Sequence, residues 1–258
     1  MRPVPDDPTP PPPSWRHRVE TALGGREVVH VLHIGKTGGT ALAHVFDQLK
    51  RRGDTPVTFK KHGHKMKRWM LPAGARFVFA VRDPIDRFYS GFYSRKRKGR
   101  PRLDVEWTPG EAAAFEAFPH AEDLAASLFT AGEGGARALD AMRAIRHVRD
   151  FQLDWFDDLH RLFHVDPPLA ILRQQSLSAD LVATLTALGV TTDVPLPADD
   201  IHAHRNDYRD CPRLSAEARA NLERWYAADF CFVAMAERWM RDRRAEWETG
   251  PKPARMHG

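Results

Sequence analysis

A turn with two adjacent glycines lies where an apolar segment gives way to a helical pattern, and turns of this kind bind phosphate. Residues 28–34 are apolar and rich in β-branched side chains, which predicts a buried strand, and apolar residues at helical spacing predict a helix over 41–52. Glycine lets the backbone approach an anion closely, lysine adds positive charge, and threonine offers a hydroxyl. The expected anion-binding residues are Lys36, Thr37, Gly38, Gly39 and Thr40.

The same turn matches the end of a Walker A loop, because Gly35 is followed by Lys36 and Thr37. A Walker A loop also needs a glycine five residues before Gly35, where this chain has His30, inside the predicted strand. The turn is therefore too short to wrap a triphosphate, which argues against this interpretation. A plain glycine turn that binds nothing is the other alternative.

A second candidate anion site follows the strand predicted over 77–81. Arg82 ends this strand, and the Asp-Pro pair after it favours the start of a helix that carries Ser90 two turns in. Such an arginine and serine can bind a phosphate in the crevice where open α/β sheets bind ligands. Alternatively, Arg82 pairs with Asp83 or Asp86. Two anion sites on neighbouring strands suggest one nucleotide with phosphates at both ends.

Helices and strands alternate along the rest of the chain. The further predicted elements are a strand at 57–59, a helical region at 111–160 broken at Pro119 and 132–135, a strand at 169–172, a helix at 178–188 and a long helix at 215–239. This alternation predicts one α/β domain, with a parallel central sheet covered by helices on both faces. The expected boundaries are a disordered proline-rich tail at 1–26, the domain at 27–245 and a flexible tail at 246–258.

Composition excludes several classes of protein. Of the 258 residues 42% are hydrophobic, which is enough for a core and excludes disorder throughout. The chain has only two cysteines, Cys211 and Cys231, so it is no disulfide scaffold, and both are expected to be buried thiols. No apolar segment could span a membrane or act as a signal core, which predicts a cytoplasmic protein. Two basic runs, 60–68 and 95–102, form solvated surface or attract phosphate, sulfate, nucleic acid or acidic polysaccharide.

Together, the two candidate anion sites resemble the nucleotide-binding segments of sulfotransferases. Residues 33–40, His-Ile-Gly-Lys-Thr-Gly-Gly-Thr, are similar to the HIPKTGGT signature that binds the 5′-phosphosulfate, and residues 81–90 resemble the segment that binds the 3′-phosphate. The likeness is to the carbohydrate branch, which includes uronosyl 2-O-sulfotransferases. It extends over 28–235, with weaker similarities at 147–152, 172–176 and 204–206. Gly35 replaces the usual proline, which should loosen the turn, and Gln174 and Gln175 stand where the family commonly has a glutamate.

The resemblance implies a P-loop-like sheet and 3′-phosphoadenosine 5′-phosphosulfate (PAPS) as the donor, with no metal required. Lys36 would stabilise the negative charge that grows on the leaving nucleotide, and the turn 36–40 would hold the 5′-phosphate. Arg82 and Ser90 would hold the 3′-phosphate, and Arg205 would add a later contact.

An acceptor hydroxyl needs a general base, for which His62-Gly63-His64 is the best candidate. Surrounding lysines should favour the neutral, basic form of these imidazoles at pH 7. The family carries the same His-Gly-His, which implies His64 as the base and His62 as a residue that orients the substrate. Surface histidines or a metal pair are the alternatives. The metal pair is disfavoured because no cysteine or cluster of acids nearby supplies a third ligand.

The sequence thus predicts transfer of a sulfuryl group from PAPS to a carbohydrate hydroxyl. The acceptor is expected to be acidic, because two basic segments border the base, and a small-molecule hydroxyl is an alternative. Two other classes compete: a P-loop-like nucleotide kinase that uses Asp83 as a Walker B acid, and a nucleic-acid binder that uses 95–102. The sulfotransferase interpretation expects no nucleic acid partner. Aromatic residues that could stack on adenine or sugar, or pack in the core, are Trp69, Trp107, Trp155 and Trp225.

Overall fold

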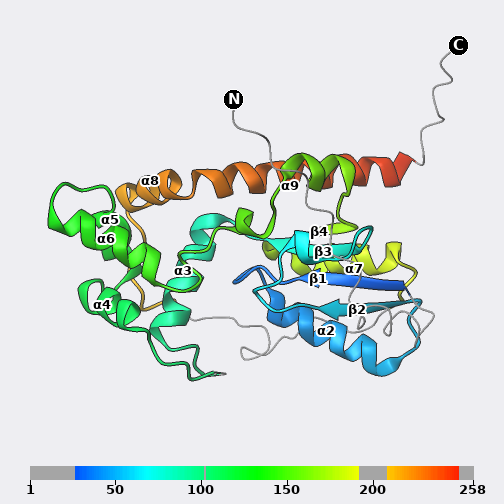
Figure 1. The fold of residues 1–258 in the computed structure, drawn as a ribbon, viewed down its shortest axis with the longest axis horizontal. Coiled ribbons are helices and arrows are strands. Elements are labelled where there is room, and N and C mark those ends of the chain that lie inside the picture. Colours follow the sequence, from blue (N-terminus) through cyan, green and yellow to red (C-terminus); the bar gives the residue numbers. More distant parts are fainter. Residues whose placement is uncertain (1–26, 102, 192–207, 250–258) are drawn as a thin grey trace, which may run out of the picture.

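Parallel strands form a central sheet in the spatial order β2-β1-β3-β4 (Figure 1). The fold is described from a computed structural model that covers residues 27–101, 103–191 and 208–249. The strands are β1 (Glu27–Leu32), β2 (Val57–Lys61), β3 (Arg76–Val81) and β4 (Ala170–Arg173). The expected α/β fold, with a parallel sheet flanked by helices, is confirmed. The predicted tail at 1–26 lies outside the described residues.

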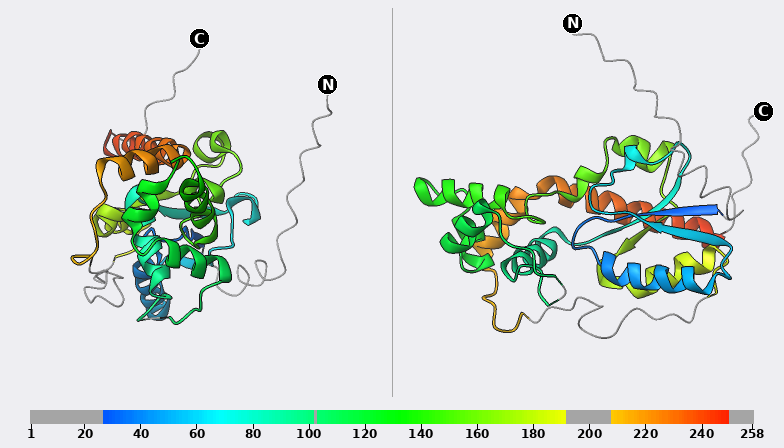
Figure 2. Two further views of the ribbon diagram at one scale, coloured as in Figure 1. Left: turned by 90° about the vertical axis from the view of Figure 1, so that its left-hand side faces the viewer. Right: turned by 60° about the horizontal axis from the view of Figure 1, so that its bottom comes forward.

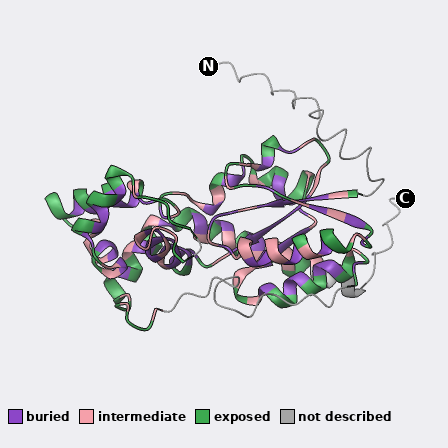
Figure 3. Ribbon diagram, turned by 90° about the horizontal axis from the view of Figure 1, so that it is seen from below, coloured by how far each residue is buried: buried purple, intermediate pink, exposed green. Residues whose placement is uncertain are grey.

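Helices cover both faces of the sheet. Strand side chains alternate in direction, so Val78 and Ala80 of β3 pack toward α2 (Gly39–Arg52) and α7 (Leu177–Ala187). These two helices lie side by side on one face (Figure 2). The alternate residues of β3 pack against α9 (Ala227–Thr249) and the segment 155–163 on the other face. The strands are consequently buried along most of their length (Figure 3).

The register of the strands brings three loops to the same edge of the sheet. Leu32 of β1 lies opposite Phe79 of β3, and Val31 lies opposite Lys61 of β2. Because the strands are parallel, the segments that leave their carboxyl ends emerge side by side. The sheet therefore positions the glycine turn, the histidine pair and the arginine together.

A second core lies beside the sheet, among helices at the left of Figure 1. These helices are α3 (Pro84–Lys96), α4 (Pro109–Ala117), α5 (Ala121–Ser127), α6 (Glu133–Ala144) and α8 (Ala216–Trp225). α3 starts at the carboxyl end of β3 and continues into this cluster, where Phe88 and Phe92 are fully buried. It thus connects the edge of the sheet to the helical core.

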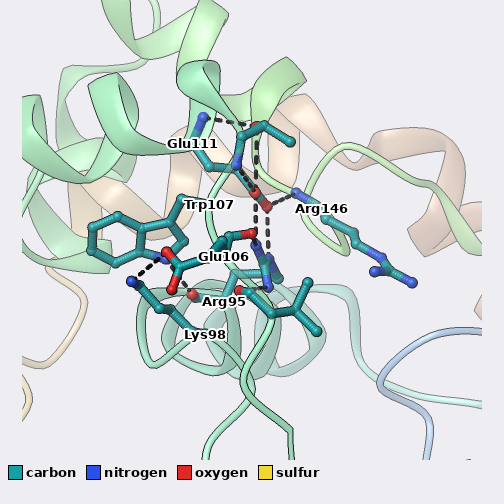
Figure 4. Close-up of polar contacts among 8 residues, drawn as sticks. Arg95, Lys98, Glu106, Trp107, Glu111 and Arg146 are labelled. Atoms are coloured by element: carbon teal, nitrogen blue, oxygen red, sulfur yellow. Dashed lines mark hydrogen bonds and ion pairs between the residues drawn. The ribbon is translucent and has the colours of Figure 1, made fainter.

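A buried ion pair joins α3 to α4 (Figure 4). Arg95 donates from Nε and Nη2 to the two carboxylate oxygens of Glu111, each at 2.7 Å. Glu111 also accepts hydrogen bonds from the backbone N–H groups of Thr108 and Arg146. These bonds lower the pKa of Glu111 to about 2, although its burial alone would raise it. Arg95 also donates to the carbonyl oxygens of Val105 and Glu106, so the ion pair fixes these two residues beside α3.

The prediction of one long final helix was wrong. The expected helix 215–239 is two helices, α8 and α9, and α9 continues to Thr249, past the expected domain end. The break falls at Tyr226, whose buried hydroxyl donates to the carbonyl oxygen of Val148 at 2.6 Å. The break predicted at 132–135 falls at the start of this cluster: α5 ends at Ser127, and α6 begins after its N-cap Gly132, whose φ is 83°.

The segment after α6 is also less helical than expected. Residues 145–158 form turns, bends and one short 3-10 helix, Gln152–Trp155. The other short helices are Arg68–Met70 and Gln174–Ser176, both 3-10, and the π-helix Arg161–Val165. Cys231 is exposed on α9, against the expectation of a buried thiol, and Cys211 is partly buried. None of the described helices combines the length and apolar character needed to span a membrane.

Candidate functional site

The three predicted segments meet at one cavity of about 530 Å³ at the carboxyl edge of the sheet. From the glycine turn, the cavity is lined by Lys36, Gly38, Gly39 and Thr40. From the other segments, it is lined by His62, Gly63, His64, Arg82 and Ser90. Arg205 lies outside the described residues. Nine residues from three separate parts of the sequence thus share one site.

The glycine turn presents the start of α2 to this cavity. Lys36 and Gly38 adopt left-handed backbone conformations, with φ of 68° and 91°. A Cβ at Gly38 would come within 2.7 Å of Leu177 Cδ2, so this position also lacks space for a side chain. The first turn of α2 carries no acidic residue, and no side chain caps its N–H groups. These N–H groups are therefore available to an anion.

Thr37 has a different place from the one expected. Its hydroxyl is buried and donates to the carbonyl oxygen of Ile34 at 3.0 Å. The side chain therefore closes the turn internally, and Thr37 does not line the cavity. Thr40, in contrast, does.

Positive charge gathers in the cavity without a balancing acid. Within the described chain, Lys36 Nζ has no hydrogen bond or ion pair, and no aspartate or glutamate lines the cavity. Burial, followed by the charges of Arg82, Arg97 and Arg87, lowers the pKa of Lys36 to about 8. An uncompensated, partly buried cation costs stability, and an anion would relieve that cost.

Arg82 lies beside the glycine turn, as the order of the strands requires. Its Nη1 atom donates to the carbonyl oxygen of Lys36 at 3.3 Å. Asp83 and Asp86, both described, form no ion pair with Arg82, and Asp83 instead caps α3 by accepting from Asp86 N at 2.9 Å. The alternative in which Arg82 is neutralised by these acids is therefore not supported. Ser94, one turn beyond Ser90 on α3, also lines the cavity.

Two buried residues that the sequence did not indicate hold these segments in place. Arg87 donates from Nε to the carbonyl oxygen of Gly35 at 2.9 Å and from Nη1 to that of Asp150 at 2.6 Å. Gln152 hydrogen-bonds to the backbone of Arg82, and its own N–H donates to Asp229. Their partners are far apart in the sequence, so no local pattern could have revealed these bonds.

His64 has the tautomer and the charge that a general base requires. Its Nδ1 lies 3.1 Å from the carbonyl oxygen of His33, which can only accept, so Nδ1 carries the proton and Nε2 keeps its lone pair. Burial lowers the pKa of His64, and the charges of Arg146 and Lys61 lower it further. The neutral form is thus favoured mainly by burial and only secondarily by neighbouring cations.

His62 forms a hydrogen bond with another histidine. Its Nε2 lies 2.8 Å from Nδ1 of His30, and the two rings are nearly parallel. His62 is buried but still borders the cavity. This contact helps to fix the orientation of the His62 ring at the edge of the cavity.

Two further histidines line the cavity, and the sequence predictions gave neither of them a role. His33 packs against His64 with ring centroids 4.0 Å apart, and His147 meets His64 edge-on at 5.4 Å. A Cβ on Gly35 would come within 2.8 Å of His147 Nδ1. The absence of a side chain at Gly35 therefore makes room for the His147 imidazole, whereas the sequence predicted only a looser turn at this position.

Three basic residues of the run 95–102, namely Arg95, Lys98 and Arg100, form ion pairs with nearby acidic residues. Besides Arg95, Lys98 pairs with Glu106 at 2.6 Å and Arg100 pairs with Asp104 at 2.8 Å (Figure 4 shows the first). In the run 60–68, Arg68 is buried and pairs with Asp166 at 3.5 Å. Of these runs, Lys61 and the histidines are the side chains that border the cavity.

The four tryptophans considered for stacking on a ligand do not line the cavity. Trp155 is in the core, while Trp107 and Trp225 pack against the helical core, and Trp69 is exposed. Leu103 and Gly99 form the wall near Ser94 instead.

Comparison of the sequence with protein-family models and with curated proteins finds no match. The chemistry must therefore be inferred from the geometry. The cavity combines two neighbouring cationic sites, one of them at a helix N-terminus, with a neutral imidazole whose Nε2 can accept a proton. This arrangement suits a dianionic ligand and the deprotonation of a second molecule beside it.

Proposed function

We propose that the protein is a PAPS-dependent sulfotransferase with a P-loop-like nucleotide site, acting on a hydroxyl of a carbohydrate acceptor. One observation carries this proposal: the unpaired Lys36, the Arg82–Ser90 pair and the neutral His64 line a single cavity. The resemblance of residues 33–40 and 81–90 to sulfotransferase segments supports it independently.

The residues present fit a nucleotide with an anion at each end. The N–H groups at the start of α2 and the Lys36 ammonium would bind the 5′-phosphosulfate. Arg82, with Ser90 and Ser94 on one face of α3, would bind the 3′-phosphate. The unpaired, partly buried cation supports such a ligand because binding restores the missing counter-charge.

The donor supplies a sulfuryl group on a phosphate leaving group. Transfer forms a bond from the acceptor oxygen to sulfur and breaks the bond from sulfur to the 5′-phosphate oxygen, which keeps the electron pair. Lys36 would stabilise the charge that develops on this oxygen. His64 Nε2 would take the proton from the acceptor hydroxyl, and the Nδ1 bond to His33 would stabilise the resulting imidazolium.

The acceptor half of the cavity supports a negatively charged substrate. Lys61, His62 and His64 border it, and no carboxylate does so among the described residues. An acidic glycan fits this lining, and a small-molecule hydroxyl remains the alternative. Mass spectrometry of acidic polysaccharides, neutral polysaccharides and small alcohols incubated with labelled PAPS distinguishes these, since only the true class gains a sulfate.

A nucleotide kinase is the competing enzyme class. Its Walker B acid would be Asp83, but that carboxylate caps α3. Isothermal titration decides between the two classes. We expect adenosine 3′,5′-bisphosphate (PAP) to bind without magnesium and ATP to bind at least tenfold more weakly. Preferential, magnesium-dependent binding of ATP would refute the sulfotransferase.

A further inference from the structure

His147 borders the reaction centre from a position that the proposed mechanism has not used. Resting on the sulfotransferase proposed above, we propose that His147 is a catalytic residue whose neutral imidazole donates a hydrogen bond to the sulfuryl group in transit. This role is separate from that of His64, which accepts the proton of the acceptor.

The backbone holds His147 in an unusual conformation. Its φ is 71°, in the left-handed region that non-glycine residues rarely occupy. Two glycines flank it: a Cβ on Gly35 would lie 2.8 Å from His147 Nδ1, and one on Gly91 would lie 3.2 Å from the His147 carbonyl oxygen. A strained residue that fits only between two glycines is closely specified, and such strain concentrates at functional sites.

The ring lies in the same cavity as the two residues between which the proposed transfer takes place. His147 lines the same cavity as Lys36 and His64, and it meets the His64 ring edge-on at 5.4 Å. In the proposed mechanism, sulfur travels between an oxygen near Lys36 and one near His64 Nε2. Neither ring nitrogen of His147 has a hydrogen-bond partner within the described chain. The imidazole therefore has a donor available for a ligand.

The surroundings of His147 keep its imidazole neutral, and this determines what its N–H group can do. Burial, and then the charges of Lys36 and His64, lower the pKa of His147 to about 2. The ring is thus neutral at any working pH, so it neither gives up nor takes a proton during the reaction. A fixed neutral N–H directed at a sulfuryl oxygen would stabilise charge there without proton transfer.

Comparison of two nucleotides tests this contact without an acceptor, because PAPS and PAP differ only by the sulfuryl group. We expect His147→Phe, which keeps a ring but no donor, to weaken PAPS binding about tenfold and to leave PAP binding within twofold. His147→Asn, which tolerates the left-handed backbone but has a shorter reach, should behave alike if the phenylalanine variant does not fold. The exposed His160, outside the cavity, supplies the control: His160→Phe should change neither affinity.

Nuclear magnetic resonance gives a second readout. The imidazole ¹⁵N signals of His147 should shift when wild-type protein binds PAPS and shift far less with PAP. Equal losses of PAPS and PAP affinity would mean that His147 only shapes the turn, and unchanged affinities would mean that it makes no contact. Either result overturns the inference while the sulfotransferase stands. If wild-type protein binds neither nucleotide, the proposed function itself fails, and this inference fails with it.

Discussion

The side-chain amide of Gln152 hydrogen-bonds to both backbone polar atoms of Arg82. Arg82 N donates to Gln152 Oε1 at 3.0 Å, and Gln152 Nε2 donates to the Arg82 carbonyl oxygen at 2.8 Å. Gln152 is fully buried, and its own N–H donates to Asp229 at 2.9 Å. The backbone just beyond β3, where no further strand partner satisfies it, is thus held by one glutamine.

Removal of this amide should make the backbone of Arg82, part of the proposed 3′-phosphate site, more mobile. In Gln152→Met, the N–H and C=O of Arg82 lose their partners, so we expect the free energy of unfolding to fall by about 2–3 kcal/mol. Because Arg82 then loses its fixed position, PAP affinity should fall about tenfold. Urea unfolding and isothermal titration measure these effects. Unchanged PAP affinity in a destabilised protein would show that Gln152 supports the fold alone.

We expect Lys36 to lower the stability of the ligand-free protein and to increase its affinity for the nucleotide. Its pKa of about 8 lies below its ordinary value of 10.5, so the unfolded chain binds more protons between these pH values. The stability of the ligand-free protein should therefore rise as pH increases from 8 to 10.5. Lys36→Met should remove this dependence, stabilise the free protein at pH 7 by about 1 kcal/mol and weaken PAP binding at least tenfold.

Thermal unfolding across this pH range, with and without PAP, tests the Lys36 prediction. The matched control is Lys50→Met, on the exposed side of α2, which should alter neither property. A Lys36→Met protein that is less stable than wild type at pH 7 would contradict the idea of an uncompensated cation.

Replacement of His64 should separate turnover from nucleotide binding. His64→Gln keeps a side chain of similar polarity but has no basic nitrogen, so sulfuryl transfer should fall 10²- to 10⁴-fold, roughly, while PAP affinity stays unchanged. Because the pKa of His64 is lowered, the wild-type rate should decline only below pH 6.5, its ordinary value. His160→Gln is the control. Near-normal turnover of His64→Gln would assign the base elsewhere.

The positions of Lys36 and Arg82 could be predicted because local signals determine them. A short apolar run marks each of β1 and β3, which are buried almost continuously, and a glycine turn or an Asp-Pro pair follows each strand, so only the parallel order had to be inferred. The roles of His147 and Gln152 could not be predicted. Both sit in an irregular segment, and their contacts depend on how α3 and α9 pack. Long-range packing also broke the last helix at Tyr226, where apolar periodicity continues on both sides.

The ion pair between Arg95 and Glu111 should govern stability in acid. The pKa of Glu111 is about 2 in the fold and 4.5 ordinarily, so its contribution is complete above pH 4.5 and is lost as pH falls toward 2. Glu111→Gln leaves Arg95 buried without its partner and should cost about 3–5 kcal/mol at pH 7. Glu116→Gln, exposed on the same helix, should cost almost nothing. Urea unfolding at pH 3 and pH 7 measures the stability of both variants. A small loss of stability in Glu111→Gln at pH 7 would contradict the contribution assigned to the buried pair.

Substitutions at Gly35 and His147 should be energetically coupled, because the His147 ring fills the space that a side chain at position 35 would need. A Cβ at Gly35 would lie 2.8 Å from His147 Nδ1, so Gly35→Ala should destabilise the protein by about 1–3 kcal/mol. Adding His147→Gly removes the obstructing ring and suits the φ of 71°, so the double variant should recover most of that stability but not the lost preference for PAPS over PAP. Gly134→Ala, where a Cβ meets nothing within 4 Å, is the control. A double-mutant cycle in urea measures the coupling, and strictly additive effects would show that the glycine in this turn serves something other than the imidazole.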